Sequence, residues 1–319
     1  MPTAGPRSVG ISHLAYRLPQ SRKTLSALKR SKQLRSSVAF LDELGFSHGF
    51  VTEEPEHFDE LLVDAAEEAM ADSGLSRAQI GTLFLYSGLN PQPRGARAAV
   101  ILERFRYPVA KLADQLELPH VNAMALSQQG CSGLLSAINL AARTVETGDS
   151  PAALCVAGDA LPKNANREIM YNVMSDAAAA VVVERRSPRN QIVSFHQLGQ
   201  PAYWDSPQRE RELVAAYFPM AQRAICAALE QAGLRLSDIR WIVPSNVSLR
   251  SWTILAQLLR IPVSRIWSKN IARVGHTVCC DHVINLRDMS QAGALTRGDH
   301  LLLFTFGFGA SWTTLILQH

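Results

Sequence analysis

The sequence predicts an α/β protein whose fold is built from two similar halves. Segments that read as helices and as apolar strands alternate along the chain, which is typical of parallel sheets covered by helices. The order of helix, turn and strand in the first half recurs in the second half, which indicates an internal duplication. Because binding sites often lie where two similar units meet, we expect the active site at the seam between the halves.

The clearest repeat joins residues 69–88 to residues 228–246, which read AMADSGLSRAQIGTLFLYSG and ALEQAGLRLSDIRWIVPSN. Each segment has the pattern of the end of an amphipathic helix, a Gly-Leu stop, a polar turn that contains an isoleucine, and an apolar strand. The aligned pairs are Gly74 with Gly233 and Ile80 with Ile239.

A second repeat joins residues 141–160 to residues 289–309. Both segments read as a helix, a Gly-Asp turn and a buried strand. With both repeats taken into account, we expect an N-terminal half over residues 1–165 and a C-terminal half over residues 166–319.

Composition narrows the classes of function. The 319 residues are 47% hydrophobic and 19% charged, which is typical of an ordinary globular protein with a large core. The formal net charge of +4 comes from scattered Lys and Arg, so we expect no nucleic-acid partner. Apolar runs are too short to span a membrane, and MPTAGPRSVG lacks the apolar core of a signal peptide. We therefore expect a cytoplasmic protein whose five cysteines are reduced.

One cysteine stands between two glycines in LSQQGCSGLLSAINLAARTVETGD, residues 126–149. Apolar residues at three- and four-residue steps predict a buried helix that ends at Gly148, with Cys131 in or just before its first turn. Free N–H groups and the helix dipole favour a thiolate there, and Gly130 and Gly133 allow backbone or substrate to approach closely. The alternative is a small core cysteine without a chemical role.

Four further motifs give the chain a family resemblance when they are taken with the duplicated pattern and Cys131. They are SDAAAAVVVE at 175–184, VPSNVSLR at 243–250, NIARVGHTVCCD at 270–281 and FGFGASW at 306–312. The chain resembles the thiolase superfamily, and within it most closely the ketoacyl-acyl-carrier-protein synthase III family. The resemblance spans nearly the whole chain, with the motifs in order.

This resemblance implies a homodimer of thiolase-like five-layered αβαβα sandwiches, in cytoplasmic fatty-acid or polyketide biosynthesis. In such enzymes a cysteine takes an acyl group from a coenzyme A or acyl-carrier-protein thioester, and no cofactor is bound permanently. The acyl group usually passes to a malonyl thioester with formation of a carbon–carbon bond.

Carried over position by position, Cys131 matches the acylated nucleophile of the family. Ser245 stands where the family has a catalytic histidine, and His276 stands where it has an asparagine. The expected Cys-His-Asn set therefore becomes Cys131, Ser245 and His276. The resemblance also implies an oxyanion hole formed by the N–H groups of Cys131 and Phe308, where Phe308 replaces a glycine and its ring reshapes the pocket.

Two reactions and one inactive role stay open at this point. A decarboxylative condensation needs two donors on the malonyl carbonyl, and His276 with Ser245 or Asn246 would supply them. Transfer of the acyl group to a hydroxyl or amine needs only an activated thiol, an oxyanion hole and one base. The order of the motifs favours condensation, whereas Ser245 favours transfer. The third possibility is a catalytically silent partner of an active subunit.

Substrate-binding positions also follow from the resemblance. Arg250 matches an arginine near the mouth of the coenzyme A tunnel, Ser248 replaces an asparagine beside it, and Tyr107 matches an aromatic residue that reaches into the partner subunit's acyl pocket. The tryptophan and arginines that hold coenzyme A have no counterpart, so a carrier-protein donor fits better. The extended loop before Tyr107 carries basic residues, which suit an acidic carrier protein: Arg94, Arg97, Arg104 and Arg106.

Two other motifs predict no further site. The stretch CCDH, Cys279 to His282, lacks the spacing of a zinc site, so we expect core packing and no metal. The glycines of GFGFG do not precede a helix with an acidic residue about 20 positions later, so a dinucleotide site is not expected.

Overall fold

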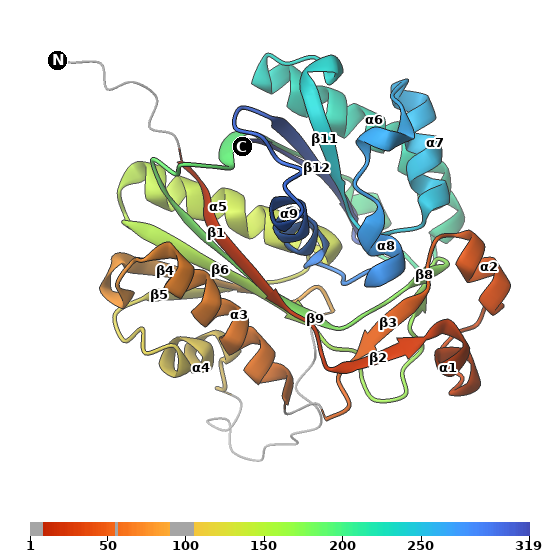
Figure 1. Ribbon diagram of the computed structural model, residues 1–319, viewed down its shortest axis with the longest axis horizontal. Coiled ribbons are helices and arrows are strands. Elements are labelled where there is room, and N and C mark those ends of the chain that lie inside the picture. The colour runs from red at the N-terminus through yellow and green to blue at the C-terminus, as the bar shows by residue number, and fades with distance from the viewer. Residues whose placement is uncertain (1–8, 55–56, 90–104) are drawn as a thin grey trace.

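The computed structural model describes residues 9–54, 57–89 and 105–319 around one large mixed sheet (Figure 1). The nine strands lie in the order β11-β12-β13-β10-β1-β9-β6-β4-β5. Their bounds are β1 Val9–Arg17, β4 Ile80–Tyr86, β5 Asn122–Leu126, β6 Ala152–Asp159, β9 Ala177–Arg185, β10 Gln191–Gly199, β11 Ile239–Pro244, β12 His300–Gly307 and β13 Ser311–Gln318. The register of β1 and β10 joins Gly10 to Gln191, and at this seam the sheet divides into two halves.

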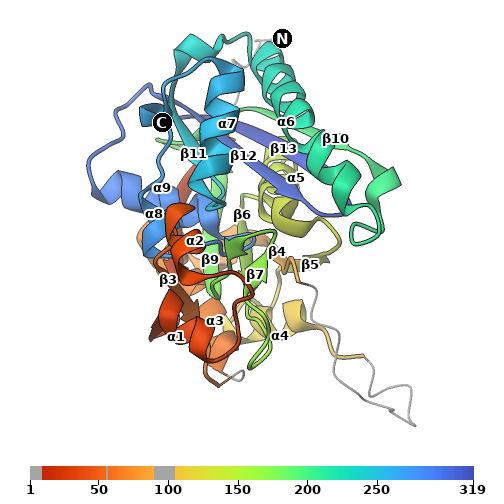
Figure 2. The same cartoon turned by 90° about the vertical axis from the view of Figure 1, so that its right-hand side faces the viewer.

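Helices cover both halves of the sheet and fill the space between them (Figures 1 and 2). The outer helices are α3 Phe58–Ser73 and α4 Pro108–Gln115 on one face, and α6 Glu210–Ala232 and α7 Leu249–Leu259 on the other. The inner helices are α5 Gly133–Thr147 and α9 Asp281–Gln291. Three large hydrophobic clusters separate these layers, and the central one contains residues of α5, α9 and both halves of the sheet. This is the five-layered αβαβα sandwich that we expect from the sequence.

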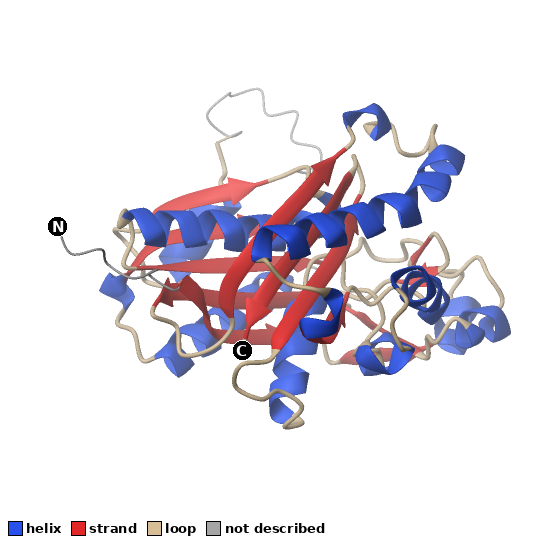
Figure 3. Cartoon of the chain, turned by 90° about the horizontal axis from the view of Figure 1, so that it is seen from above, coloured by secondary structure: helices blue, strands red, loops and turns tan. Residues whose placement is uncertain are grey.

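The predicted duplication is visible in the geometry. Helices α3 and α6 both end at a left-handed glycine, Gly74 with φ 68° and Gly233 with φ 65°. Glycine adopts this conformation without steric cost, which is why each helix stops there. Strands β4 and β11 then begin at the aligned residues Ile80 and Ile239. Seen from above in Figure 3, long helices lie across the strands of the sheet.

Sheet membership places the change from the first half to the second between β9 and β10. Strand β9 pairs with both β6 and β1, so the chain as far as Arg185 belongs to the first half of the sheet. The boundary between residues 165 and 166 that we expect from the sequence falls before β9. The run SDAAAAVVVE is buried as β9 because helices cover both of its faces.

Short elements form a separate unit at one end of the sandwich (Figure 1). They are β2 Ser21–Thr24, α1 Leu25–Arg30, α2 Val38–Glu43, β3 His48–Val51, β7 Glu168–Ile169, β8 Asn172–Val173 and α8 Lys269–Arg273. Arg167 and Asp176 form a fully buried, bidentate ion pair, and the backbone N–H of Arg167 donates to the carbonyl of Gln33. These contacts fix the segment before β9 to the end of the sandwich. No helix in the described parts of the chain is long and apolar enough to cross a membrane.

Candidate active site

Cys131 lies in a tight turn directly before helix α5. The turn spans Gly130–Ser132, and α5 ends at Thr147, after which Gly148 is left-handed with φ 93°. Cys131 is 9% exposed and lines a cavity. Both the position of the thiol and the end of the helix agree with the sequence-based expectation. The free N–H groups and dipole at the start of α5 favour negative charge on the sulfur.

Both glycines beside Cys131 allow close approach. A Cβ at Gly130 would lie 2.5 Å from the backbone nitrogen of Phe308, and a Cβ at Gly133 would lie 2.0 Å from the Tyr86 ring. The Tyr86 hydroxyl donates to the carbonyl of Gly130 at 2.5 Å. The turn that carries the thiol is therefore held between a tyrosine on β4 and the backbone after β12.

We expect Gly133→Ala to destabilise the fold and to slow acylation of Cys131. The added methyl group would overlap the Tyr86 ring, and overpacking of this kind typically costs about 1–3 kcal/mol. Urea denaturation and the acylation rate would measure both effects. For stability the matched control is Gly199→Ala, because a Cβ at Gly199 meets nothing within 4 Å; Gly199 lines the cavity, so this variant is not a control for the acylation rate. Equal stability of the two variants would contradict this packing role.

His276 reaches Cys131 from the second half of the chain. Its loop follows left-handed Gly275, and the His276 N–H donates to the carbonyl of Val173 at 2.8 Å. The His276 carbonyl in turn accepts from the N–H of Ser175 at 2.8 Å. With the loop fixed in this way, the His276 Nε2 lies 3.4 Å from the Cys131 Sγ. The structure thus brings together the thiol and the imidazole that we expect to act together.

Asp281 completes the arrangement, and our sequence analysis did not identify it. One carboxylate oxygen of Asp281 lies 2.6 Å from the His276 Nδ1 and also accepts from the N–H of Asn246 at 2.6 Å. The other oxygen accepts from the N–H and the hydroxyl of Thr277. Cys131, His276 and Asp281 therefore form a hydrogen-bonded chain. The signal available in the sequence was an acidic residue at the start of a helix, five positions after the histidine.

The chain of three residues carries charge although it is buried. Burial by itself would lower the pKa of His276, but the charges of Asp281 and Cys131 and the hydrogen bonds to both residues raise that pKa well above its ordinary value. Burial would raise the pKa of Asp281, but the charge of His276 and hydrogen bonds from His276 and Thr277 hold that pKa below its ordinary value. The pair is thus an imidazolium and a carboxylate, and the imidazolium faces the sulfur.

Ser245 and Asn246 are buried and are not among the residues that line the cavity. The N–H of Ser245 donates to the carbonyl of Phe304, and the Ser245 carbonyl accepts from the Trp252 indole. The side-chain oxygen of Asn246 accepts from Asn285. Asn246 supports Asp281 through its backbone N–H.

The backbone nitrogen of Phe308 lies close to Gly130, next to the nucleophile in the chain. Phe308 lines the cavity, and its ring packs edge-on against Phe306 with centroids 5.3 Å apart. Among the described residues, neither the N–H of Phe308 nor that of Cys131 makes a backbone hydrogen bond beyond those within helices and strands. Backbone N–H groups at these two positions are of the kind that stabilises the oxyanion of a tetrahedral intermediate, and their role as an oxyanion hole stays a prediction.

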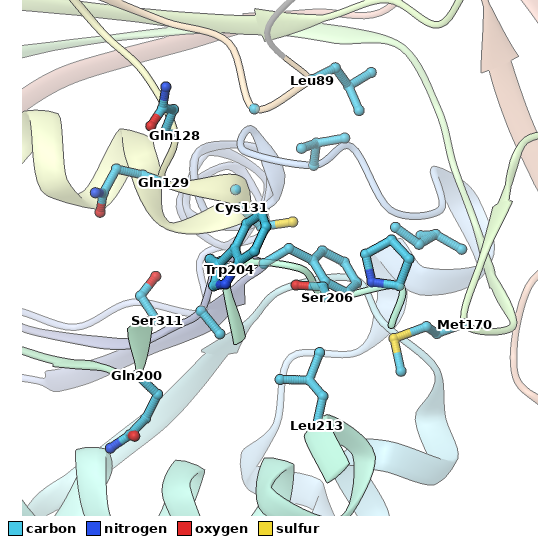
Figure 4. Close-up of a pocket in the computed structure, with 18 of the residues that line it drawn as sticks. Leu89, Gln128, Gln129, Cys131, Met170, Gln200, Trp204, Ser206, Leu213 and Ser311 are labelled. Atoms are coloured by element: carbon cyan, nitrogen blue, oxygen red, sulfur yellow. The ribbon is translucent and has the colours of Figure 1, made fainter. Parts of the chain in front are cut away.

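The cavity in front of Cys131 has a volume of about 1030 Å³ (Figure 4). Apolar side chains form much of its wall, among them Met170, Met174 and Leu213, whereas Arg35 and Glu210 lie on its exposed rim. The most exposed large aromatic side chain of the described residues, Trp204 at 80%, also lines it. The sulfur is therefore open to a space that accepts an apolar group.

Comparisons with known proteins agree with this geometry. Two family models match: 3-oxoacyl-[acyl-carrier-protein] synthase III over residues 127–200, and the C-terminal part of the same enzyme over residues 229–319. Together they match just over half of the chain. The chain belongs to the ketoacyl synthase III family. It is an acyl-transferring enzyme with the thiolase fold, and the family models contain Cys131, His276 and Asp281 within their matched ranges.

Individual ketoacyl synthase III proteins are distant relatives. The synthase III of Aquifex aeolicus is 23% identical over 270 residues, which cover 81% of this chain and 83% of the relative. Its crystal structure superposes with a TM-score of 0.84 and covers 98% of this chain and 100% of that chain at 22% identity. ChlB3, described as an acyltransferase, superposes with the same TM-score at 21% identity and covers 98% and 97% of the two chains. These superpositions show the shared fold.

In this chain, the remaining residues that we predict to bind substrate lie outside the cavity wall. Ser248 caps helix α7 by accepting from the N–H of Ser251. Arg250 is exposed on the first turn of α7. Tyr107 is 60% exposed at the start of α4, beside Phe105. Of the four loop arginines, Arg106 is exposed. The other three, Arg94, Arg97 and Arg104, lie outside the described residues.

The residues of the CCDH motif have different structural tasks. The thiol of Cys279 donates to buried Asp159, which also accepts from the N–H groups of Gly88 and Leu89 at the cavity wall. Burial lowers the pKa of His282 to about 4, so its neutral ring donates to the carbonyl of Phe304. Asp281 is the member of the motif that reaches the site.

Proposed function

We propose that this protein accepts an acyl group from a thioester on Cys131 and transfers it to a hydroxyl or amine without forming a carbon–carbon bond. The observation that carries the proposal is the position of His276 between the Cys131 sulfur and the Asp281 carboxylate. A nucleophile, a base and a residue that orients the base are the parts required for covalent acyl transfer.

Acylation of the enzyme begins with the Cys131 sulfur beside His276, which holds the proton of the pair. The Cys131 sulfur attacks the thioester carbonyl, and the N–H groups of Cys131 and Phe308 stabilise the resulting oxyanion. The bond between the acyl carbon and the donor sulfur then breaks. The departing thiolate takes the proton of His276, so the products are a free donor thiol, acyl-Cys131 and a neutral imidazole.

Transfer to the acceptor uses the imidazole that acylation leaves neutral. Once Cys131 is acylated it carries no charge, so one of the causes that raise the pKa of His276 is lost. His276 takes the proton of the acceptor hydroxyl or amine while the acceptor attacks the acyl carbon. The bond between this carbon and the Cys131 sulfur breaks, which releases the ester or amide and restores the ion pair.

The same geometry disfavours condensation. Stabilising the enolate of a malonyl thioester requires two donors on its carbonyl oxygen. His276 can supply one of them, but Ser245 and Asn246 are not in the cavity wall. The direct contact of His276 with Asp281 also makes the imidazole a stronger base, which suits proton removal from an acceptor. The order of the sequence motifs favours condensation, but the geometry of the site favours the transfer reaction.

For the donor we propose an acyl carrier protein rather than coenzyme A, and for the assembly a homodimer. Arg250 is exposed on α7, where it can attract an acidic carrier helix. Strand β5 lies at the edge of the sheet, and a second copy could extend the sheet by pairing with it. Tyr107 is exposed at the start of α4, which packs against β5, as a contact with a partner subunit requires.

A two-stage experiment tests the reaction. Hexanoyl pantetheine thioester is added to the protein, and intact mass spectrometry is expected to show one hexanoyl adduct. The adduct is then treated either with malonyl pantetheine thioester or with an excess of ethanolamine. We expect hexanoyl ester or amide from ethanolamine and no release of CO₂ from the malonyl thioester. Stoichiometric CO₂ with a 3-ketoacyl product would establish condensation, and the absence of any adduct would favour a silent subunit.

A further inference from the structure

The cavity wall across from Cys131 contains a turn with two bulky residues in an unfavourable conformation (Figure 4). Strands β7 and β8 form a short antiparallel hairpin, and Met170 and Tyr171 connect them. Both residues are left-handed, with φ 45° and φ 65°. Two successive positive φ values are typical of a type I′ turn, in which asparagine and glycine are preferred because other side chains are strained. Such a conformation persists when its surroundings hold it, and it is often found at functional sites.

Asn172 holds this turn and ties it to helix α7. Its side-chain N–H₂ donates to the carbonyls of Ile169 and Met170 at 3.1 and 3.2 Å. Its side-chain oxygen accepts from the N–H of Ser248 at 2.8 Å, and Ser248 is the residue that caps α7. Three hydrogen bonds from one side chain thus fix the turn relative to the face that carries Arg250.

Glu168 fixes the other side of the hairpin through a second set of hydrogen bonds. The Glu168 carboxylate accepts from the N–H groups of Arg35 and Ser36 at 2.8 Å each, and from the Ser36 hydroxyl at 2.6 Å. Burial alone would raise the pKa of Glu168, but these hydrogen bonds hold it below its ordinary value, so the carboxylate stays charged. The hairpin is therefore held at both ends by side-chain hydrogen bonds.

The turn separates its two side chains. Met170 lines the cavity, whereas the Tyr171 ring is 58% exposed and packs edge-on against Phe40, with centroids 5.5 Å apart. Ile169, next to the turn, packs against the small cluster that contains Cys131. Figure 4 shows the thioether of Met170 among the side chains that line the cavity with Cys131.

We propose that Met170 is a specificity-determining residue that limits the bulk of the apolar acyl group accepted by Cys131, and that Asn172 is its positioning residue. The inference rests on the proposed acylation of Cys131 and deepens it by naming what selects the acyl group. The selected class is an unbranched acyl chain, because Met170 lines the cavity that the Cys131 sulfur faces and its flexible side chain adapts to an alkyl group.

The test compares acylation rates of the full-length protein with acetyl, hexanoyl and phenylacetyl pantetheine thioesters, followed by intact mass spectrometry. Met170→Ala is expected to raise the phenylacetyl rate relative to the acetyl rate by about tenfold or more. A single methylene group more or less in an apolar pocket typically changes the preference between two substrates by at least this factor. Met170→Phe is expected to shift the same ratio in the opposite direction, which keeps the test informative where the smaller side chain impairs folding.

Further variants separate positioning from general damage. Asn172→Asp keeps the acceptor for Ser248 but loses both donors to the turn, so its rate ratio is expected to move toward that of Met170→Ala. Tyr171→Gly suits the left-handed position and is expected to keep the wild-type ratio. Met220→Ala makes the same change as Met170→Ala at a methionine of α6 that does not line the cavity. This variant is also expected to keep the wild-type ratio of rates.

The outcomes distinguish this inference from the proposed function. Acylation of every variant with an unchanged ratio of rates would overturn the role of Met170 and leave the acyl-transfer chemistry intact. A uniform change for all three donors would likewise overturn it, because selection by bulk requires unequal effects. Absence of an adduct on the wild-type protein with any donor would overturn the proposed function, and the inference with it.

Discussion

Cys131→Ala is expected to abolish the acyl adduct and to lower turnover by at least about 10⁴-fold. Removal of a covalent nucleophile eliminates the route that it provides and leaves only what the oxyanion donors and substrate binding contribute. Intact mass spectrometry after incubation with hexanoyl pantetheine thioester measures the adduct, and release of free pantetheine measures turnover. The variant changes a small residue that is 9% exposed, so its stability is expected to change little.

Cys226→Ala is the matched control for this prediction. Cys226 is the exposed free cysteine of the described residues and lies on α6, far along the chain from the nucleophile. This variant is expected to form the adduct at the wild-type rate. An adduct that persists on Cys131→Ala and disappears from Cys226→Ala would show that exposure, rather than the environment at the start of α5, determines reactivity.

The fold could be predicted from the sequence because its signals are local and occur twice. Gly74 and Gly233 mark the ends of equivalent helices, and Ile80 and Ile239 begin equivalent strands. Periodicity also located the helix after Cys131. Sheet membership was harder, because pairing of β9 with β1 and β6 is a long-range contact that no local pattern around residue 166 reveals.

The candidate site could be predicted only in part, for a geometric reason. A family position fixes where a residue stands in the chain, but the direction of its side chain depends on the turn that carries it. Ser245 occupies the position of a catalytic histidine, yet the turn after β11 leaves it outside the cavity wall. Asp281 contacts His276 because the loop folds back onto the start of α9, and spacing alone did not indicate this contact.

The strained turn is a further feature that sequence patterns could not indicate. Met170 and Tyr171 are not residues that predict a type I′ turn, so the segment carries no turn signal. The turn is fixed instead by Asn172 and Glu168, whose partners Ser248, Arg35 and Ser36 are remote in sequence. Where distant contacts override local preference in this way, only coordinates reveal the result.

Asp281→Asn is expected to lower turnover by about 10² to 10⁴-fold while the protein still forms the acyl adduct slowly. The carboxylate orients the imidazole and stabilises its protonated form, and an amide does neither as well. Kinetics with hexanoyl pantetheine and ethanolamine would measure the loss. The matched control is Asp288→Asn on the same helix, since Asp288 pairs with Arg273 and Tyr16 outside the cavity. Equal losses in both variants would point to damage of α9 instead.

The pH dependence of acylation gives the same substitution a specific signature. The negative charge of Asp281 is a principal cause of the raised pKa of His276, so its removal lowers that pKa. The imidazolium exists below this pKa, and acylation needs its proton for the departing thiol. The descending limb of the acylation profile at high pH is therefore expected to move to lower pH in Asp281→Asn. If the descending limb of Asp281→Asn stayed at the wild-type position, Asp281 would not act through His276. For Asp288→Asn, a purely structural change would give slower acylation with an unshifted pH profile.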